Sequence, residues 1–130
     1  MLLSIAYVSR PLCRFTDLEL VNLWECAHEN NEQSGITGGL YYDGHVFFQV
    51  LEGDSSKLWP LLGRIRRDPR HSDLEVLVEN DIASPSFRFW PVKFIDGRAS
   101  IRLQEKFSLE SLGSMRVADL NSNVFKLAML

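Results

Sequence analysis

A hairpin signal lies near the middle of the chain, where two apolar, aromatic-rich segments, residues 37–42 and 45–52, are joined by Asp43-Gly44. Asp-Gly between two strand-like runs favours a tight turn, because both residues accept the positive φ angles that such a turn requires. The second segment is apolar at successive positions, which is typical of a strand buried on both faces. We therefore predict an antiparallel pair whose second strand is central in its sheet.

A strand and a helix are predicted before this hairpin. Residues 2–8 have strand character, and Pro11 ends the strand because proline cannot continue a central ladder. Thr16 and Glu19 have the spacing of a capping box, so a helix is expected from about residue 17 to about residue 30. Helical spacing assigns its buried face to Leu20, Leu23, Trp24 and Ala27.

A second helix and two further strands are predicted after the hairpin. The helix begins in residues 53–56, stops at Asp68-Pro69, and accommodates Pro60 only if that residue lies near its first turn. Residues 73–82 and about 87–95 then have strand character. The apolar stripe of the helix is predicted to comprise Leu58, Leu61, Leu62 and Ile65.

The predicted order, β-α-β-β-α-β-β, is the split βαβ pattern of an α+β, ferredoxin-like sheet with two helices on one face. We expect this domain to occupy residues 1–95. Residues 96–130 are expected to form a C-terminal helical extension that caps the sheet, mediates self-association into a homo-oligomer, or docks a partner. The apolar residues that suggest two short helices there are Leu109, Leu112, Leu120, Val124 and Leu127.

Composition excludes several classes of function. The net charge of −3 gives no support for nucleic-acid binding, and no apolar run is long enough to span a membrane. Cys13 and Cys26 are not spaced as metal ligands, and no metal site is expected. We interpret them as free thiols of a cytoplasmic protein.

Two polar residues occupy positions where an apolar one would serve a core better. Gln49 lies within the predicted central strand, where a buried amide without partners costs about 1–3 kcal/mol. Tyr7 shares a face of the first strand with Leu3 and Ile5. A local hydrogen bond also explains Gln49, and a tyrosine on an inward face is usually a core aromatic whose hydroxyl is hydrogen-bonded, so these positions alone do not establish a site.

Two polar clusters end the predicted helices. Asn30 and Asn31 end the first, which is common for asparagine. Basic residues at the end of the second include Arg64 and Arg70, and such clusters usually complement a helix dipole in solvent. Motifs of hydrolases, P-loop proteins, dinucleotide-binding folds and zinc proteases are absent from the sequence.

Taken together, these residues resemble a BLUF domain, the flavin-binding module that senses blue light using FAD. The resemblance covers about residues 2–95. Its motifs are Ile5-Ala6-Tyr7-Val8-Ser9, Asn30-Asn31, Gly35-Ile36-Thr37-Gly38-Gly39-Leu40-Tyr41-Tyr42, Phe48-Gln49-Val50-Leu51-Glu52-Gly53, Arg64-Ile65, Asp68-Pro69-Arg70-His71 and Phe87-Arg88-Phe89-Trp90.

The resemblance implies roles for the unexplained polar residues. Tyr7 matches the tyrosine that donates an electron and a proton to excited flavin, and Gln49 matches the glutamine between that phenol and the ring. Glutamine has a donor and an acceptor on one group, so it can turn or tautomerise and exchange its hydrogen bonds. The implied cofactor-binding residues are Asn30, Asn31, Arg64, Ile65, Asp68, Arg70 and His71.

Trp90 and Val92 match positions implicated in signal transmission. The chain departs from the family pattern at Val92, where many members carry methionine, and at Pro85, where arginine is frequent. Valine offers no thioether to Gln49, although the carbonyls of the fifth strand remain available. Because the photochemical pair is retained, we still expect a reversible hydrogen-bond switch.

The resemblance therefore implies a blue-light photoreceptor that binds FAD and signals to an unidentified partner protein without catalytic turnover. Only about 35 residues follow the predicted sheet, too few for a cyclase or phosphodiesterase domain. Two alternatives remain open: a light-independent flavin redox protein, and a flavin-free interaction module. Bound flavin without a spectral shift would favour the first, and a colourless protein the second.

Overall fold

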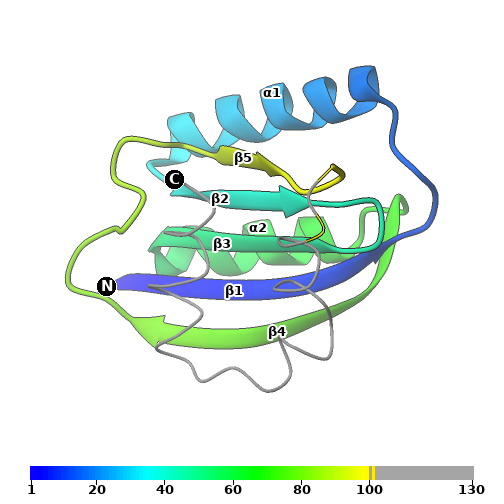
Figure 1. Cartoon of the computed structure of the whole chain (residues 1–130). Coiled ribbons are helices and arrows are strands. Elements are labelled where there is room, and N and C mark those ends of the chain that lie inside the picture. The colour runs from blue at the N-terminus through cyan, green and yellow to red at the C-terminus, as the bar shows by residue number, and fades with distance from the viewer. Residues whose placement is uncertain (100, 102–130) are drawn as a thin grey trace.

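The computed structural model describes residues 1–99 and residue 101. Five strands form one mixed sheet in the order β4-β1-β3-β2-β5 (Figure 1). The predicted order of strands and helices and the α+β class are confirmed. The elements are β1 (Leu2–Pro11), α1 (Asp17–Ser34), β2 (Thr37–Tyr42), β3 (Phe47–Asp54), α2 (Ser55–Arg66), β4 (His71–Asp81) and β5 (Lys93–Asp96).

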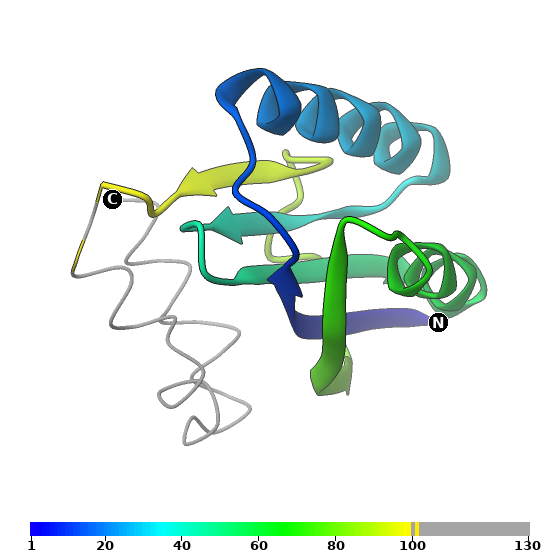
Figure 2. The same cartoon turned by 90° about the vertical axis from the view of Figure 1, so that its right-hand side faces the viewer.

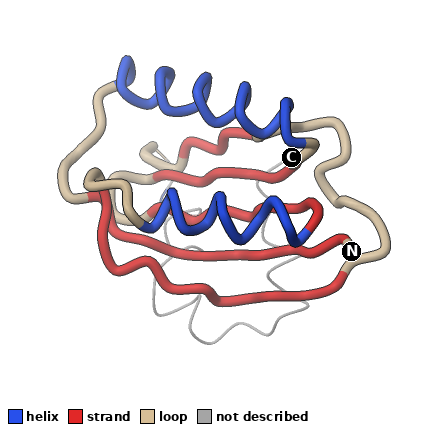
Figure 3. The backbone as a smooth tube through the Cα atoms, turned by 180° about the vertical axis from the view of Figure 1, so that it is seen from behind, coloured by secondary structure: helices blue, strands red, loops and turns tan. Residues whose placement is uncertain are grey.

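Both helices pack on the same face of the sheet, as expected. Turned by 90° from Figure 1, the structure shows α1 above β2 and β5, and α2 beside β1 and β3 (Figure 2). From behind, α2 lies in front of the strands and α1 lies above them, both roughly parallel to the strands (Figure 3). No helix among the described residues is long and apolar enough to cross a membrane.

Strand β3 is central, between β1 and β2, as its apolar pattern predicted. Successive side chains of β3 point to opposite faces of the sheet, so the strand contributes to two separate apolar clusters. One apolar cluster on the helix side includes Ile5, Tyr7 and Leu51 with Leu58 of α2, and another on the opposite face includes Phe48. The helix side is therefore where a buried polar residue of β1 or β3 meets the helices.

The hairpin loop is longer than predicted. Residues 43–46 all lie outside the strands, and β3 begins at Phe47 rather than at residue 45. The Asp43 carboxylate accepts hydrogen bonds from the backbone N–H groups of His45 (2.8 Å) and Val46 (3.0 Å). Because these N–H groups bond to Asp43, they do not extend the β2–β3 ladder. Within the loop at 43–46, Gly44 alone has a positive φ, of 92°.

Helix α1 is also longer than predicted, ending at Ser34 instead of near residue 30. Gly35 provides the end, with a left-handed φ of 68° and its N–H directed to the last carbonyls. Asn30 and Asn31 therefore lie one turn inside the helix, and the interpretation of this pair as a helix terminus is wrong. The Thr16–Glu19 capping box is confirmed at the other end.

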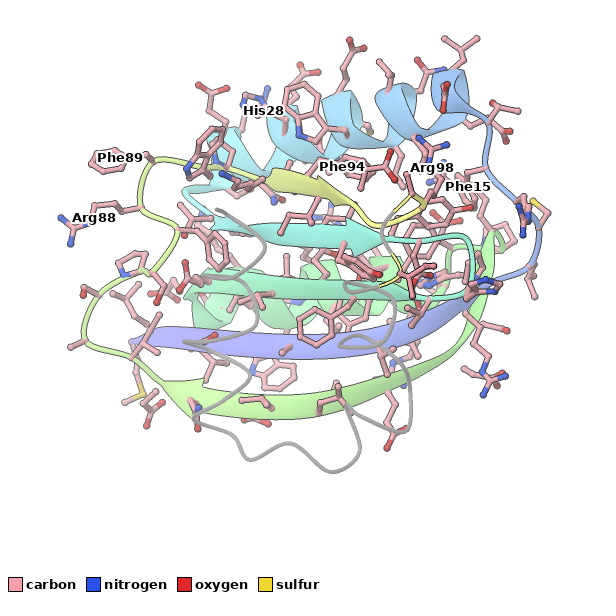
Figure 4. All side chains as sticks on the ribbon, viewed as in Figure 1. Phe15, His28, Arg88, Phe89, Phe94 and Arg98 are labelled. Atoms are coloured by element: carbon pink, nitrogen blue, oxygen red, sulfur yellow. The ribbon has the colours of Figure 1, made fainter. Side chains whose placement is uncertain are left out.

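The prediction of a strand over 87–95 is wrong for its first half. Residues 87–90 form a turn closed by the Trp90 N–H on the Phe87 carbonyl (2.8 Å), and β5 starts at Lys93. Pro91 lacks a backbone donor, so the ladder cannot begin earlier. The loop's Arg88 and Phe89 point away from the domain (Figure 4), and Phe89 is 84% exposed.

Pro60 lies sixth in α2, beyond the first turn where it was expected. A proline there removes the backbone bond to the carbonyl of Ser56. The burial of Leu58 and Leu62 against the sheet keeps the helix in place despite this loss.

Candidate functional site

A cleft of about 340 Å³ lies between α1, α2 and the helix side of the sheet; we call it the interhelical cleft. All nine residues predicted for photochemistry or cofactor binding line it, whereas Trp90 and Val92 do not. The lining comprises Tyr7, Phe15, Asn22, Leu23, Cys26, Ala27, Asn30, Asn31, Leu40, Phe47, Gln49, Leu61, Arg64, Ile65, Asp68, Arg70 and His71.

Tyr7 and Gln49 lie directly opposite each other on the paired strands β1 and β3. Both side chains are buried, and the Tyr7 hydroxyl donates a hydrogen bond to Oε1 of Gln49. Gln49 Nε2 has no hydrogen-bond acceptor within the described part of the chain. A buried amide nitrogen at a cleft wall without an acceptor requires an outside partner, since leaving it unpaired is costly.

The electrostatics of the cleft keep Tyr7 protonated. Burial raises the pKa of the Tyr7 phenol above its ordinary value, and the negative charge of Asp68 raises it further. Asp68 stays ionised because hydrogen bonds from the Arg70 guanidinium lower the pKa of its carboxyl group. A neutral phenol therefore faces Gln49 across the whole physiological pH range.

Asn31 connects the cleft to the segment before β5. Its side chain is 2% exposed, and Nδ2 donates to the Pro91 carbonyl at 2.9 Å. That bond leaves Oδ1 as the atom available to a ligand, because the structure gives it no donor within residues 1–99. Asn30, the residue before Asn31, is exposed, and its Nδ2 lies 3.7 Å from Cys26 Sγ.

The histidine at the cleft floor is fixed by two contacts. His71 Nε2 lies 2.5 Å from the Ile65 carbonyl, which only accepts, so Nε2 carries the proton. Nδ1 then accepts from the Ser9 hydroxyl at 2.7 Å when the ring is neutral. His71 thereby ties the end of α2 to β1 and is oriented by the protein itself.

Sequence reasoning missed several lining residues. Asn22 and Cys26 resemble a solvated helix face, although their spacing of four places them in line with Asn30. Leu23 and Ala27 were predicted to be buried, and they are only half-buried because they border the cleft. This incomplete burial of an apolar helix face becomes visible only in the structure, where it marks the wall of the cleft.

The cleft suits a flat, largely apolar ring with a polar edge. Apolar side chains from α1, α2 and the sheet form most of its walls, and the unpaired amide atoms of Gln49 and Asn31 supply a donor and an acceptor. Its volume lies in the usual range for small-molecule sites, about 300–1,000 Å³. An isoalloxazine ring, with its carbonyls and one N–H on a single edge, meets this description.

Comparison with protein families matches residues 2–93 to BLUF, described as sensors of blue light using FAD. The chain belongs to the BLUF family. FAD is thus the cofactor that this family uses, and the residues of the interhelical cleft fit its flavin ring.

Relatives and solved structures agree with a BLUF domain. The photoactivated adenylate cyclase subunit alpha-like protein FB of Euglena gracilis is 35% identical over 85 residues. The match covers 65% of this chain and 8% of the Euglena protein. The dark-state structure of BlrB, a BLUF protein, superposes with a TM-score of 0.79 at 28% identity, covering 98% of this chain and 96% of that one. A bacterial light-regulated adenylyl cyclase gives 0.75 at 29% identity, covering 81% of this chain and 31% of the cyclase.

The BLUF residues expected to transmit a signal lie outside the cleft. Trp90 is 44% exposed, and Lys93 Nζ lies 4.6 Å from the centre of its ring. Val92 is buried in the apolar cluster with Phe15, and its carbonyl accepts from Trp24 Nε1 at 3.0 Å. In this arrangement α1 holds the segment before β5 through main-chain carbonyls.

Proposed function

We propose that residues 1–95 act as a photoswitch in which Tyr7 and Gln49 respond to blue light, without turnover of a substrate. The observation that carries this proposal is the buried Tyr7–Gln49 hydrogen bond at the wall of a flavin-sized cleft. A BLUF domain is a sensor module, and the cyclases among its relatives are far longer than this chain.

When bound, FAD supplies the absorption of blue light and an excited state that accepts an electron. Tyr7 holds its proton in the dark, because burial and Asp68 both oppose ionisation. Gln49 Oε1 already accepts the phenolic hydrogen bond, so it lies on the shortest path for that proton. Rotation or tautomerisation of the Gln49 amide then exchanges which atom faces Tyr7 and which faces the cleft.

Asn30, Asn31, Arg64, Ile65, Asp68, Arg70 and His71 are proposed to hold the flavin. Asn31 offers Oδ1 to the ring while its Nδ2 holds the Pro91 carbonyl. A changed hydrogen bond at the ring edge therefore acts on one amide group that also anchors the segment before β5. We infer that the signal leaves by this segment, and this route requires no methionine at position 92.

The output is proposed to reach a separate signalling protein or a second copy of the chain. The C-terminal extension at 96–130, expected to mediate it, lies mostly outside the described residues. Self-association and a cytoplasmic location stay predictions.

Absorption spectra of the purified protein, recorded before and after blue light and then in the dark, test this function. We expect a flavin band that shifts to longer wavelength and relaxes. Tyr7→Phe and Gln49→Leu should each retain flavin and lose the shift. Tyr41→Phe is a matched control, because Tyr41 packs on the opposite face of the sheet. A normal photocycle in Gln49→Leu would refute the proposal, and bound flavin without any shift in the wild type would favour the redox alternative.

A further inference from the structure

Cys26 lies on α1 and is among the residues that line the interhelical cleft. Asn22 and Asn30 precede and follow it at a spacing of four, so the three side chains form one row along the wall of the cleft. The thiol is free and exposed, and its Sγ lies 3.7 Å from Nδ2 of Asn30. The proposed photoswitch makes no use of this thiol.

An exposed cysteine is ordinary by itself, and Cys13 is such a residue. Cys26 differs because it shares the cleft with two buried amides that each lack a partner. Gln49 is 5% exposed and Asn31 is 2% exposed. Within residues 1–99, Nε2 of Gln49 and Oδ1 of Asn31 have no hydrogen-bond partner. Such atoms point to a ligand in the cleft, and a ligand that fills the cleft covers the wall that carries Cys26.

A cation lies near this thiol. The pKa of the Arg70 guanidinium is raised, chiefly by its hydrogen bonds to Asp68 and in part by a negative charge at Cys26. Arg70 and Cys26 both line the cleft. Because the thiolate is the form of cysteine that attacks a disulfide, Arg70 attracts either that thiolate or an anionic reagent that approaches it.

We propose that Cys26 is a modification site through which small disulfides close the cleft to flavin, and this inference rests on the proposed flavin site. The Cys26 thiolate attacks one sulfur of the small disulfide and forms a new S–S bond with it. The original S–S bond breaks, and its other half leaves as a thiolate that takes up the proton lost by Cys26. The cysteine is thereby oxidised and the small disulfide is reduced.

The attached group and the flavin exclude each other. A cleft of about 340 Å³ has the volume of a site for one small molecule. Bound flavin therefore protects Cys26, and a group attached to Cys26 prevents flavin from binding until a reducing thiol removes it. Oxidising conditions would thus block the loading of new protein, while protein that already holds flavin would be spared.

The test uses two full-length variants that retain one cysteine each. Cys13→Ser retains Cys26, and Cys26→Ser retains Cys13. Each is exposed to oxidised glutathione with and without FAD, and mass spectrometry of the intact protein measures the rate at which glutathione is attached. With FAD at about 100 times its dissociation constant, only about one cleft in a hundred is empty, so modification of Cys26 should slow about a hundredfold. Modification of Cys13, which is not among the residues that line the cleft, should not slow.

The converse effect is measured by quenching of flavin fluorescence. After its modification, the Cys13→Ser protein should bind FAD more weakly by roughly tenfold or more, and dithiothreitol should restore its binding. The Cys26→Ser protein should have the same dissociation constant before and after exposure to oxidised glutathione. Equal rates of Cys26 modification with and without FAD, or unchanged FAD binding after that modification, would overturn this inference and leave the flavin site intact. Failure of the untreated wild type to bind FAD would overturn the flavin site as well.

Discussion

The buried carboxylate of Glu52 binds backbone N–H groups of the loop between β4 and β5, and replacing it tests how much these hydrogen bonds stabilise the fold. Glu52 is 2% exposed and lies on β3, three residues after Gln49. Oε2 accepts from the Ser86 N–H at 2.7 Å, and Oε1 accepts from the Phe87 N–H at 2.8 Å and from the Thr37 hydroxyl at 3.0 Å. Glu52→Gln preserves the size of the side chain and replaces one carboxylate oxygen by an NH₂ group, which can only donate.

The expected loss of stability follows from the geometry. If the glutamine oxygen takes the place of Oε1, its NH₂ group faces the N–H of Ser86, two donors with no acceptor between them. A hydrogen bond to a charged group contributes about 1.5–3 kcal/mol, and an unsatisfied buried donor costs about 1–3 kcal/mol. Because the two costs overlap, we expect the free energy of unfolding to fall by about 2–4 kcal/mol.

Urea unfolding of the flavin-free protein measures this change through the transition midpoint at a constant slope. Glu79→Gln is the matched control, because Glu79 is an exposed carboxylate on β4, and surface changes stay within about 0.5 kcal/mol. A loss in Glu52→Gln no larger than that of the control would refute the claim that this carboxylate anchors the loop.

Three further changes have definite expected outcomes. Gly38→Ala places a Cβ 1.9 Å from the Val50 carbonyl oxygen, so we expect little folded protein by circular dichroism. Hydrogen bonds from Ser56 lower the pKa of Asp54 to about 2, so the stability that Asp54 adds is full above its ordinary pKa of 3.8 and disappears as the pH falls toward 2. Asp54→Ala should flatten that part of an acid titration of the unfolding free energy. Val92→Met should retain the light-induced shift and change its dark recovery rate, measured by absorbance, because the longer side chain repacks a position that is 1% exposed.

Strands and helices were predictable where the hydrophobic period was strong, but their ends were not. The end of α1 depends on the left-handed Gly35, whereas the polar run Glu29-Asn30-Asn31 predicted an earlier end. The turn before β5 is held by the Glu52 carboxylate, which accepts from the Ser86 and Phe87 amides, a contact between residues more than thirty apart. Periodicity does not contain such contacts, so the sequence pattern predicts a strand where the structure has a turn at 87–90.

The candidate site was predicted better than the boundaries, for a physical reason. A buried strand excludes unpaired polar groups, so Gln49 was anomalous from sequence alone. The alignment of Tyr7 with Gln49 requires the register of β1 on β3, which no local pattern fixes. Asn22 and Cys26 were missed because exposed polar residues on a helix are ordinary, and only the cavity beside them gives them a role.

The replacement of methionine by Val92 matters less in this structure than the family pattern suggests. Its side chain packs in an apolar cluster and is not among the residues that line the cleft. Helix α1 contacts the backbone of this segment: the Asn31 amide donates a hydrogen bond to the Pro91 carbonyl, and the Trp24 indole N–H donates one to the Val92 carbonyl. Main-chain carbonyls are present whatever side chain occupies position 92. We therefore propose that a switch at Gln49 reaches β5 through the bond between Asn31 and the Pro91 carbonyl, a bond that does not involve the side chain at position 92.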